Sequence, residues 1–412
     1  MSKIIIPRKR ALLAAPAIVH MAAYANTLTT MIPTLNRVVD VVSRELTGFI
    51  PSVSLNVNGD ERAALNQTIS WHKSGTFTTA DTNVGMTVSA ASDRAPGQGT
   101  MTISKSKQVG FNMTGEEQRA LNSPGAVGVA ALAQSDFAQA LRALVNEVEN
   151  DLAVEAYKSA SRAYGTAGTT PFASTIAGTA QVRKILDDNG APGQRSLIIN
   201  TDTAANMRTL GHLNKVNEAG DAMTLRQGEL DNMHGFSIKE SGCSTFSTGH
   251  TKGTASGATT NNAGYAVGAT TITLASAGTG TIVAGDVITF AGDANQYVVV
   301  SGDADVSGGG TITIGAPGLR KAIAASATNI TVVNSYAVNV AFAQSAMRLL
   351  ARAPAVPTEG VARIDEYLLT DPRTGLQFEV SVWAGQRMVK YEVALAWGVA
   401  ATNEDHIALL IG

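Results

Sequence analysis

The sequence has little charge, one cysteine and no large excess of basic residues. Only 16% of its 412 residues are charged, and 31 Lys and Arg against 33 Asp and Glu give a formal charge of -2. Proteins that bind DNA through their own surface charge normally carry a clear basic excess, so this balance argues against that class. The single Cys243 excludes an intramolecular disulfide and zinc sites built on several cysteines.

Long apolar runs are missing beyond the N-terminal region. After residue 25 no stretch of about 18 uncharged apolar residues occurs, so no membrane contact is expected. At the start, a basic segment (3–10) precedes an apolar run that ends in Ala23-Tyr24-Ala25, a pattern typical of a secretory signal. Pro16 and His20 interrupt that run. We therefore expect an uncleaved N-terminal arm, and a cleaved signal is the alternative.

The common motifs of catalysis and cofactor binding are absent. No G-x-x-x-x-G-K-[ST] phosphate loop and no G-x-S-x-G nucleophile elbow occurs. Gly278-x-Gly280 lacks the third glycine of a dinucleotide loop, and Cys243 has no identifiable histidine partner. We predict that the chain is not an enzyme, with no catalytic, cofactor-binding or metal-binding residues and no cofactor.

Histidine and aspartate residues do not form a metal-binding pattern. The histidines are scattered without ligand spacing, and we expect them to be structural or solvated. Four aspartates lie in expected β turns without the spacing of an EF-hand loop, so turn formation is favoured over a calcium site. The basic segment at 3–10 fits a solvated arm, or contact with nucleic acid or an acidic protein surface. The residues concerned are His20, His72, His212, His234, His250 and His406, and Asp286, Asp293, Asp303 and Asp305.

The first part of the chain predicts a helix, a β ribbon and a long helix. Apolar residues at three- and four-residue spacing predict a helix over 27–47. Alternating residues predict strands within 66–113, in a ribbon that cannot bury much by itself and must rest on something else. Thr114 and Glu117 form a capping box ahead of the strongest helix, over 134–163. About 30 residues at 1.5 Å rise give a rod of ~45 Å.

The second part predicts an α+β core that is interrupted by a β module. A helix over 179–188, a strand over 196–200 and a helix from Thr201 alternate in the core. The composition changes at Ser241 to Gly, Thr, Ser and Ala, and short strands separated by turns then predict a small all-β barrel or sandwich. These strands cover 271–274, 287–290, 297–300, 311–314 and 329–332. The core pattern resumes with 342–351, 362–367, 377–383 and 390–397.

This order of elements resembles a tailed-phage major capsid protein of the HK97-like fold, in the short-tailed-phage coat group that carries an inserted β domain. Residues 111–117, leading toward 137–141, look like the entry into the spine helix of that family. Residues 226–230 and 234–241 are similar to the strand that leads into the insertion. Residues 339–342 and 391–399 resemble the return strands.

The resemblance implies an α+β, HK97-like fold with a spine helix (134–163), an extended β loop and an inserted all-β barrel. It divides the chain into an N-terminal arm (1–49), an extended β loop (50–115), a spine helix with peripheral domain (116–189), a discontinuous central and peripheral core (190–241 and 334–412) and an inserted β domain (242–333). A neighbouring copy would cover the extended loop.

The function implied by the resemblance is that of a structural protein that assembles into an icosahedral shell around packaged double-stranded DNA. Its partners would be copies of itself in pentamers and hexamers, a scaffolding protein, a portal, and DNA touched non-specifically at the inner surface. It would be located in the virion and assembled in the host cytoplasm. The signal-like start and the Thr- and Gly-rich module leave a secreted or cell-surface adhesion protein as the alternative, and a hydrolase with an unrecognised site as a third.

Overall fold

The computed structural model describes residues 35, 47–57, 62–73, 97–121, 129–215, 228, 230, 232–356, 362–372 and 374–412. Most of the helix predicted over 27–47 lies outside these residues, as does the polar stretch of the ribbon at 76–92. Of the six histidines, His20 also lies outside the described residues.

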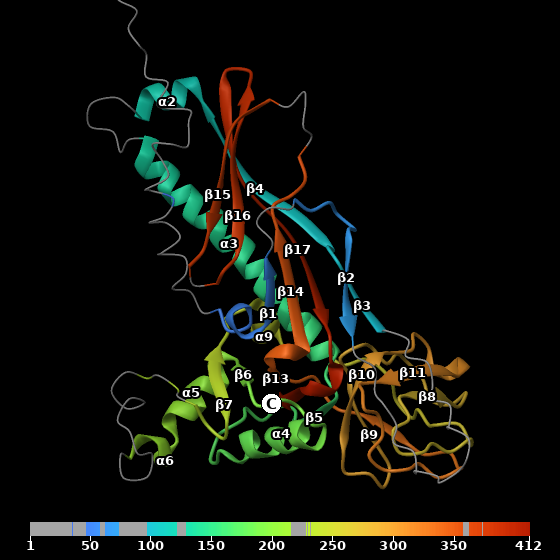
Figure 1. The fold of residues 1–412 in the computed structure, drawn as a ribbon. Helices are drawn as coiled ribbons and strands as arrows, with labels where there is room; N and C mark the ends of the chain where they lie inside the picture. The colour runs from blue at the N-terminus through green and yellow to red at the C-terminus, as the bar shows by residue number, and fades with distance from the viewer. Residues whose placement is uncertain are drawn as a thin grey trace, which may run out of the picture.

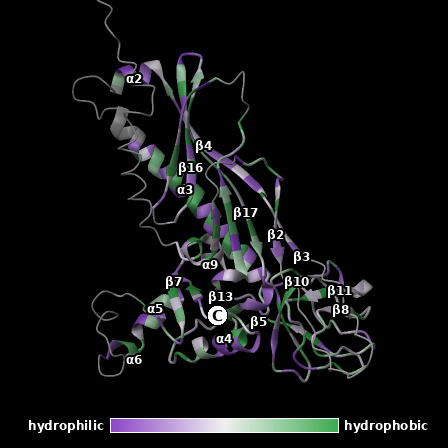
Figure 2. Ribbon diagram, viewed as in Figure 1, coloured by the Kyte–Doolittle hydropathy of each residue, from purple (hydrophilic) through white to green (hydrophobic). Residues whose placement is uncertain are grey.

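A six-stranded sheet and one long helix form the upper part of the molecule (Figure 1). In the sheet, β17 pairs with β14, β16 and β4, while β15 and β1 lie at its two ends. The elements are β1 (Ser54–Val57), β4 (Lys105–Thr114), β14 (Met347–Arg352), β15 (Arg363–Thr370), β16 (Gln377–Gly385), β17 (Met388–Ala401) and the helix α3 (Val129–Lys158). Figure 2 shows hydrophobic residues along β16 and β17, the strands at the centre of this sheet.

The helix α3 has the predicted length of about 30 residues but begins and ends five residues earlier than predicted over 134–163. The last predicted residues form β5 (Arg162–Gly165), which pairs with the C-terminal strand β18 (Ile407–Ile411). Ser161 donates its hydroxyl and its backbone N–H to the Ile407 carbonyl. The helical pattern continues past Lys158, but pairing with a strand about 250 residues later in the chain ends the helix.

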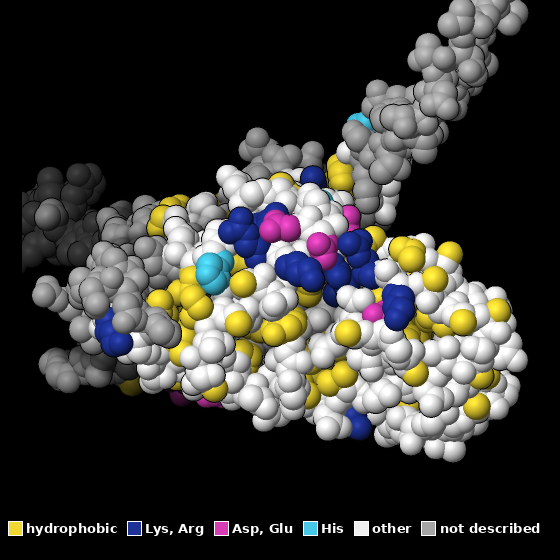
Figure 3. Space-filling model, turned by 90° about the horizontal axis from the view of Figure 1, so that it is seen from below, with side chains coloured by type: hydrophobic (Ala, Val, Ile, Leu, Met, Phe, Trp, Pro, Cys, Tyr) yellow, Lys and Arg dark blue, Asp and Glu magenta, His cyan; other side chains and the backbone are white. Residues whose placement is uncertain are grey.

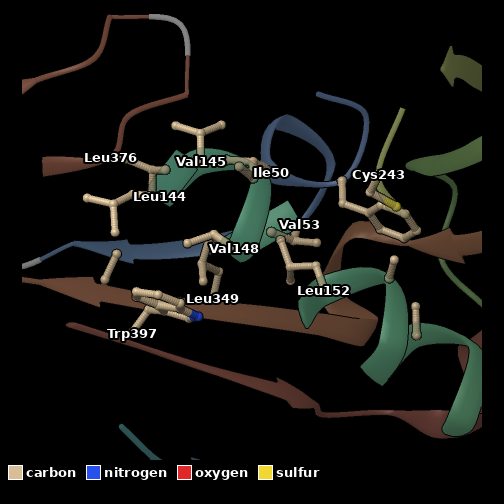
Figure 4. Packing of buried hydrophobic residues seen from close by; sticks show 14 of the residues in the cluster. Ile50, Val53, Leu144, Val145, Val148, Leu152, Cys243, Leu349, Leu376 and Trp397 are labelled. Atoms are coloured by element: carbon tan, nitrogen blue, oxygen red, sulfur yellow. The ribbon is translucent and has the colours of Figure 1, made fainter. Parts of the chain in front are cut away.

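The main core lies between α3 and the sheet (Figure 4). Leu144, Val148 and Leu152 of α3 pack against Leu349 and Trp397 of the sheet, and all five are almost completely buried. Ile50 and Val53, in and just after the turn η3 (Ile50–Ser52), close the same core. The predicted apolar stripe of the long helix is therefore its buried face.

A ten-stranded sheet forms the lower part, and the helix α4 (Ala177–Asp188) packs against it (Figure 1). Its body strands are β5, β18, β13 (Val338–Ala343), β6 (Arg195–Ile199) and β7 (Phe236–Glu240). The helices α5 (Thr201–Thr209), α6 (Gly211–Asn214) and α9 (Ser244–Thr248) complete this part. The strand predicted over 196–200 and the helices predicted at 179–188 and from Thr201 are confirmed within two residues.

The inserted segment folds around a separate core. Its strands are β8 (Thr271–Leu274), β9 (Val287–Phe290), β10 (Gln296–Ser301), β11 (Gly310–Ile314) and β12 (Ile330–Val332), each within one residue of its prediction. Thr259 bridges to Asn329 beside β12 and Thr260 bridges to Leu274 in β8, so the strands surround one apolar cluster. The insertion is not isolated from the body, because β10 pairs with β5 and extends the body's sheet.

The described part of the ribbon consists of β2 (Thr68–Lys73) and β3 (Gly97–Thr102), which pair only with each other among the residues described. Ile69, Trp71 and Met101 rest with Ile103 and Ala63 on Leu350 and Ala396 of the six-stranded sheet. The prediction that the ribbon rests on something else is confirmed, but for this part the support is the chain's own body.

The short helix α2 (Gly115–Leu121) follows β4, and its predicted capping box forms: Thr114 N–H donates to Glu117 Oε2 (2.8 Å) and Glu117 N–H to Thr114 Oγ1 (3.2 Å).

Candidate assembly surfaces

The residues that sequence analysis considered for metal binding have structural partners. His250 and Asp286, both buried, form a pair with 2.9 Å between Nε2 and Oδ1, and Asp286 also accepts the Gly253 and Val283 N–H groups. Asp293 accepts the Tyr297 hydroxyl. Within the described ranges, no group of three or more His, Cys, Asp or Glu side chains is placed to hold a metal ion.

The remaining candidates also serve the fold. Asp303 accepts the N–H of Asp305, so it forms the predicted turn. The pair at 2.5 Å between His234 Nδ1 and Thr179 Oγ1 ties the start of β7 to α4. Cys243 is buried, and that burial raises the pKa of its thiol and makes it a poor nucleophile at neutral pH. None of the described helices is long and apolar enough to cross a bilayer.

One side of the ribbon is joined to the six-stranded sheet by a network of charged residues. Arg62 donates to Glu379 (2.5 Å) and to Glu366 (2.6 Å), and also to the Pro354 carbonyl (2.9 Å). Glu379 is almost fully buried, and burial raises its pKa although Arg62 acts in the opposite direction. Arg363 lies within 3.8 Å of the same carboxylate. Because a buried carboxylate needs its cations, this network fixes the start of the ribbon.

The other side of the ribbon is joined to α3. Lys105, the first residue of β4 and three residues after the end of β3, donates to Asp151 (2.7 Å) and Glu147 (3.2 Å), and Lys107 also pairs with Glu147. On the side of the sheet, the guanidinium of Arg348 in β14 lies 4.7 Å from the centre of the Trp71 ring of the ribbon. The ribbon therefore leaves the body between two sets of ion pairs, one on the sheet and one on the helix.

The upper end of the molecule exposes apolar side chains beside unpaired strand edges. Among the described residues β15 pairs only with β16, and β4 pairs only with β17. Ile364 and Leu368 on β15 are 43% and 37% exposed, and Met388 at the start of β17 is 40% exposed. Ile364 and Met388 line an open groove of about 760 Å³ together with the start of α2. Long strand edges with apolar side chains are typical of surfaces that other chains cover.

The lower face carries interleaved charges. Figure 3 shows Lys and Arg side chains gathered with Asp and Glu on this face, below α4. Asp187 of α4 accepts from Arg195 (2.5 Å) and from Arg183 (3.4 Å). The Arg195 hydrogen bond holds the pKa of Asp187 below its ordinary value, and Arg183 adds to the effect. A face of mixed charge is suited to selecting a partner's orientation rather than to holding a polyanion.

Sequence reasoning missed the charged residues that join the ribbon to the body. Arg62 and Glu379 are separated by 317 positions, and Lys105 and Asp151 by 46. Glu379 alternates with the apolar residues of β16, a pattern that predicts an exposed side chain, so the sequence gives no signal that this carboxylate is buried and paired with Arg62.

Comparisons with known proteins give structural likenesses alone. No protein-family description and no curated protein sequence matches this chain. The chain is similar to the capsid structure of cyanophage P-SCSP1u, with 12% identity, 89% of this chain and 88% of that chain covered, and a TM-score of 0.46. It is similar to a structure of Mycobacterium phage Che8, with 13% identity, 86% and 88% covered, and a TM-score of 0.42. It is also similar to the capsid of a native GTA particle, with 11% identity, 89% and 90% covered, and a TM-score of 0.44.

Proposed function

We propose that this chain is the structural subunit of an icosahedral viral shell that encloses double-stranded DNA. The observation that carries the proposal is the upper end of the molecule, where the β4 and β15 edges and the apolar Ile364, Leu368 and Met388 lack a cover within the described chain. Soluble proteins that act alone usually blunt or cover such edges. Identical copies provide the cover when each subunit contacts several neighbours.

The order of the elements supports the same proposal. The elements follow one another in the order of the fold that the sequence resembles. They are a ribbon attached at its base, a long helix against a sheet, a lower α+β layer and an inserted β module. We propose the boundaries 1–49, 50–115, 116–189, 190–241 with 334–412, and 242–333 for its parts. The copies would form pentamers and hexamers, with many modest contacts adding to a stable shell.

The further partners follow from enclosing a genome. A scaffolding protein and a portal would direct assembly in the host cytoplasm, and packaged DNA would touch the inner surface without sequence preference. The near-zero net charge fits this role, because a closed shell confines DNA without gripping it. The shell would be a component of the virion, and its subunits would catalyse no reaction.

Charge substitutions at the upper end test the proposal. Replacing both Ile364→Lys and Leu368→Lys in the full chain places two like charges at each copy of the contact, which should prevent particle formation measured by light scattering and electron microscopy. Val267, in the inserted segment, is 61% exposed, so Val267→Lys serves as the matched control. Circular dichroism verifies that the two variants keep the wild-type fold.

Two outcomes separate the possibilities. Loss of particles in the double variant, with particles retained in the control, supports the proposal. Particle formation by the double variant at the wild-type yield would show that this end is not a contact surface.

The alternative of an exported adhesion protein predicts a mature chain cleaved after Ala25, which mass spectrometry of the natural product detects.

A further inference from the structure

Glu149 is the most completely buried charged residue of α3, and its carboxylate joins this helix to two distant segments of the chain. Glu149 is 2% exposed, and its carboxylate accepts four hydrogen bonds. Oε1 accepts from Gly48 N–H (2.6 Å), Phe49 N–H (2.8 Å) and the Ser241 hydroxyl (2.8 Å), and Oε2 accepts from Ile50 N–H (3.1 Å). The donors come from segments about 90 to 100 residues away on either side, so one side chain gathers two distant parts of the chain.

The segment that Glu149 holds fits closely against the lower sheet. A side chain added at Gly48 would meet Ile198 of β6 at 2.8 Å and the Glu240 carbonyl of β7 at 2.9 Å, so only glycine fits there. Ser52 donates its hydroxyl to the Gly48 carbonyl (2.7 Å), and Lys239 Nζ donates to that hydroxyl (2.9 Å). The three backbone N–H groups at 48–50 open the turn η3, and they have the carboxylate as their partner.

We propose that Glu149 is a proton-controlled anchor for the N-terminal segment: the ionised carboxylate holds residues 48–50 on α3, and uptake of a proton releases them. The inference concerns the folded subunit itself and does not depend on the proposed shell function. It identifies Glu149 as a positioning residue, acting through the backbone that it binds.

The chemistry of the four donors requires the ionised form. A carboxylate has lone pairs for all four hydrogen bonds, whereas a carboxylic acid carries an O–H donor that would face N–H and O–H donors. Protonation therefore removes at least one of these hydrogen bonds and leaves a donor unpaired. The titratable groups that interact with Glu149 are Lys239 on β7 and Cys243 at the start of α9, and Glu149 opposes the fall that burial causes in the pKa of Lys239.

The direction of the pKa determines what acid does. Burial raises the pKa of Glu149 above its ordinary value of 4.5, although the hydrogen bonds from Phe49, Ser241, Ile50 and Gly48 oppose this. These opposing hydrogen bonds determine the response to acid. When residues 48–50 leave while Glu149 stays buried against β7, the carboxyl loses the backbone hydrogen bonds that lower its pKa, so its pKa is higher in the released state than in the held state. The state with the higher pKa gains stability as the pH falls, so acid favours local release of residues 48–50 within a chain that stays folded.

Hydrogen exchange on the unassembled full-length chain tests the anchor. Protection factors of the Gly48, Phe49 and Ile50 amides, corrected for intrinsic exchange, should fall at least about tenfold between pH 7 and pH 4, because each hydrogen bond to a charged group stabilises by about 1.5–3 kcal/mol. Glu149→Gln should show the low protection at both pH values. Glu147→Gln, a partly exposed position one half-turn away that pairs with Lys105, should behave as wild type.

Two results would overturn the anchor. One is wild-type protection at 48–50 that does not change with pH, and this result decides the question even where Glu149→Gln fails to fold. The other is a parallel loss of protection at buried amides of α4 such as Val182, which would mean global acid unfolding instead of a local release. Failure of the chain to form particles leaves either measurement unaffected, so this inference and the proposed function fail separately.

Discussion

At the scale of the residue, buried polar groups are held by partners that lie far away in the sequence. Asp286 accepts from Gly253 and from Val283 and pairs with His250, and Tyr336 donates its hydroxyl to the Gly285 carbonyl (2.6 Å). The Tyr336 contact joins the inserted segment to the body, and the contacts of Asp286 lie within the segment, near the point where the chain enters it. A catalytic interpretation is not needed for the pair of His250 and Asp286, because both oxygens of Asp286 and Nε2 of His250 have partners within the fold.

The apolar face of α3 gives a first prediction at this scale. Leu144→Asp places a charge at a position that is 1% exposed, without a cation to pair with it, and should destabilise the chain by several kcal/mol (about 3–5 from burial and packing loss). The neighbouring Ala143 is exposed, so Ala143→Asp is the matched control and should cost well below about 1 kcal/mol. Thermal unfolding measures both, and equal shifts in the two variants would contradict the assignment of the buried face.

Asp187 gives a prediction on pH. The hydrogen bond from Arg195 lowers its pKa below 3.8 in the folded chain, so the stabilisation is present above that ordinary value and is lost as the pH falls through the folded pKa. Asp187→Asn should therefore be less stable than wild type at pH 7 and equal to it in strong acid. Melting temperatures measured from pH 7 to pH 2 check this, and a difference that is constant over the whole range would contradict it.

At the scale of the element, the ribbon combines an uncovered polar face with a firmly attached base. Thr68, Ser70 and Thr100 are exposed, while Ile69, Trp71 and Met101 contact the body. Alternation along the strands creates the two faces, because successive side chains point to opposite sides. The attachment at Arg62 and at Lys105 determines the direction in which the ribbon leaves the body.

Removing one attachment should loosen the ribbon. Arg62→Gln leaves the buried Glu379 with Arg363 at 3.8 Å as its nearest described cation and should raise the pKa of Glu379 further. Protease cleavage between β1 and β4 should then accelerate by about tenfold or more, since a hydrogen bond to a charged group contributes about 1.5 kcal/mol or more. Arg183→Gln removes an exposed cation from α4 and is the control. An unchanged cleavage rate in Arg62→Gln would show that the network does not hold the ribbon.

Local patterns predicted the elements well where local interactions determine them. The capping box at Thr114 and Glu117 forms as predicted, and the short strands of the insertion agree within one residue because turn-forming glycines and aspartates separate them. The predicted C-terminal end of α3 was wrong by five residues, because Arg162–Gly165 forms a strand that pairs with β18. Glu149 could not be assigned a role from the sequence, because its partners Gly48 and Ser241 become neighbours only in the folded chain.

At the scale of the whole molecule, the structure combines well-packed cores with edges that no described part of the chain covers. The clusters around α3, beside α4 and inside the insertion are closed by their own residues. In contrast, the upper end leaves β15 and β4 unpaired on one side, and the lower face presents interleaved charges (Figure 3). The proposed assembly accounts for this division of surfaces, because neighbouring copies would cover the open edges.

Cryo-electron microscopy of the purified full-length chain, with and without a co-expressed scaffolding protein, tests this central claim most directly. The account predicts closed particles in which the β15 edge and the exposed Ile364, Leu368 and Met388 lie against a neighbouring copy. A population that stays monomeric or dimeric under every assembly condition, or a shell in which these residues face solvent, would contradict it.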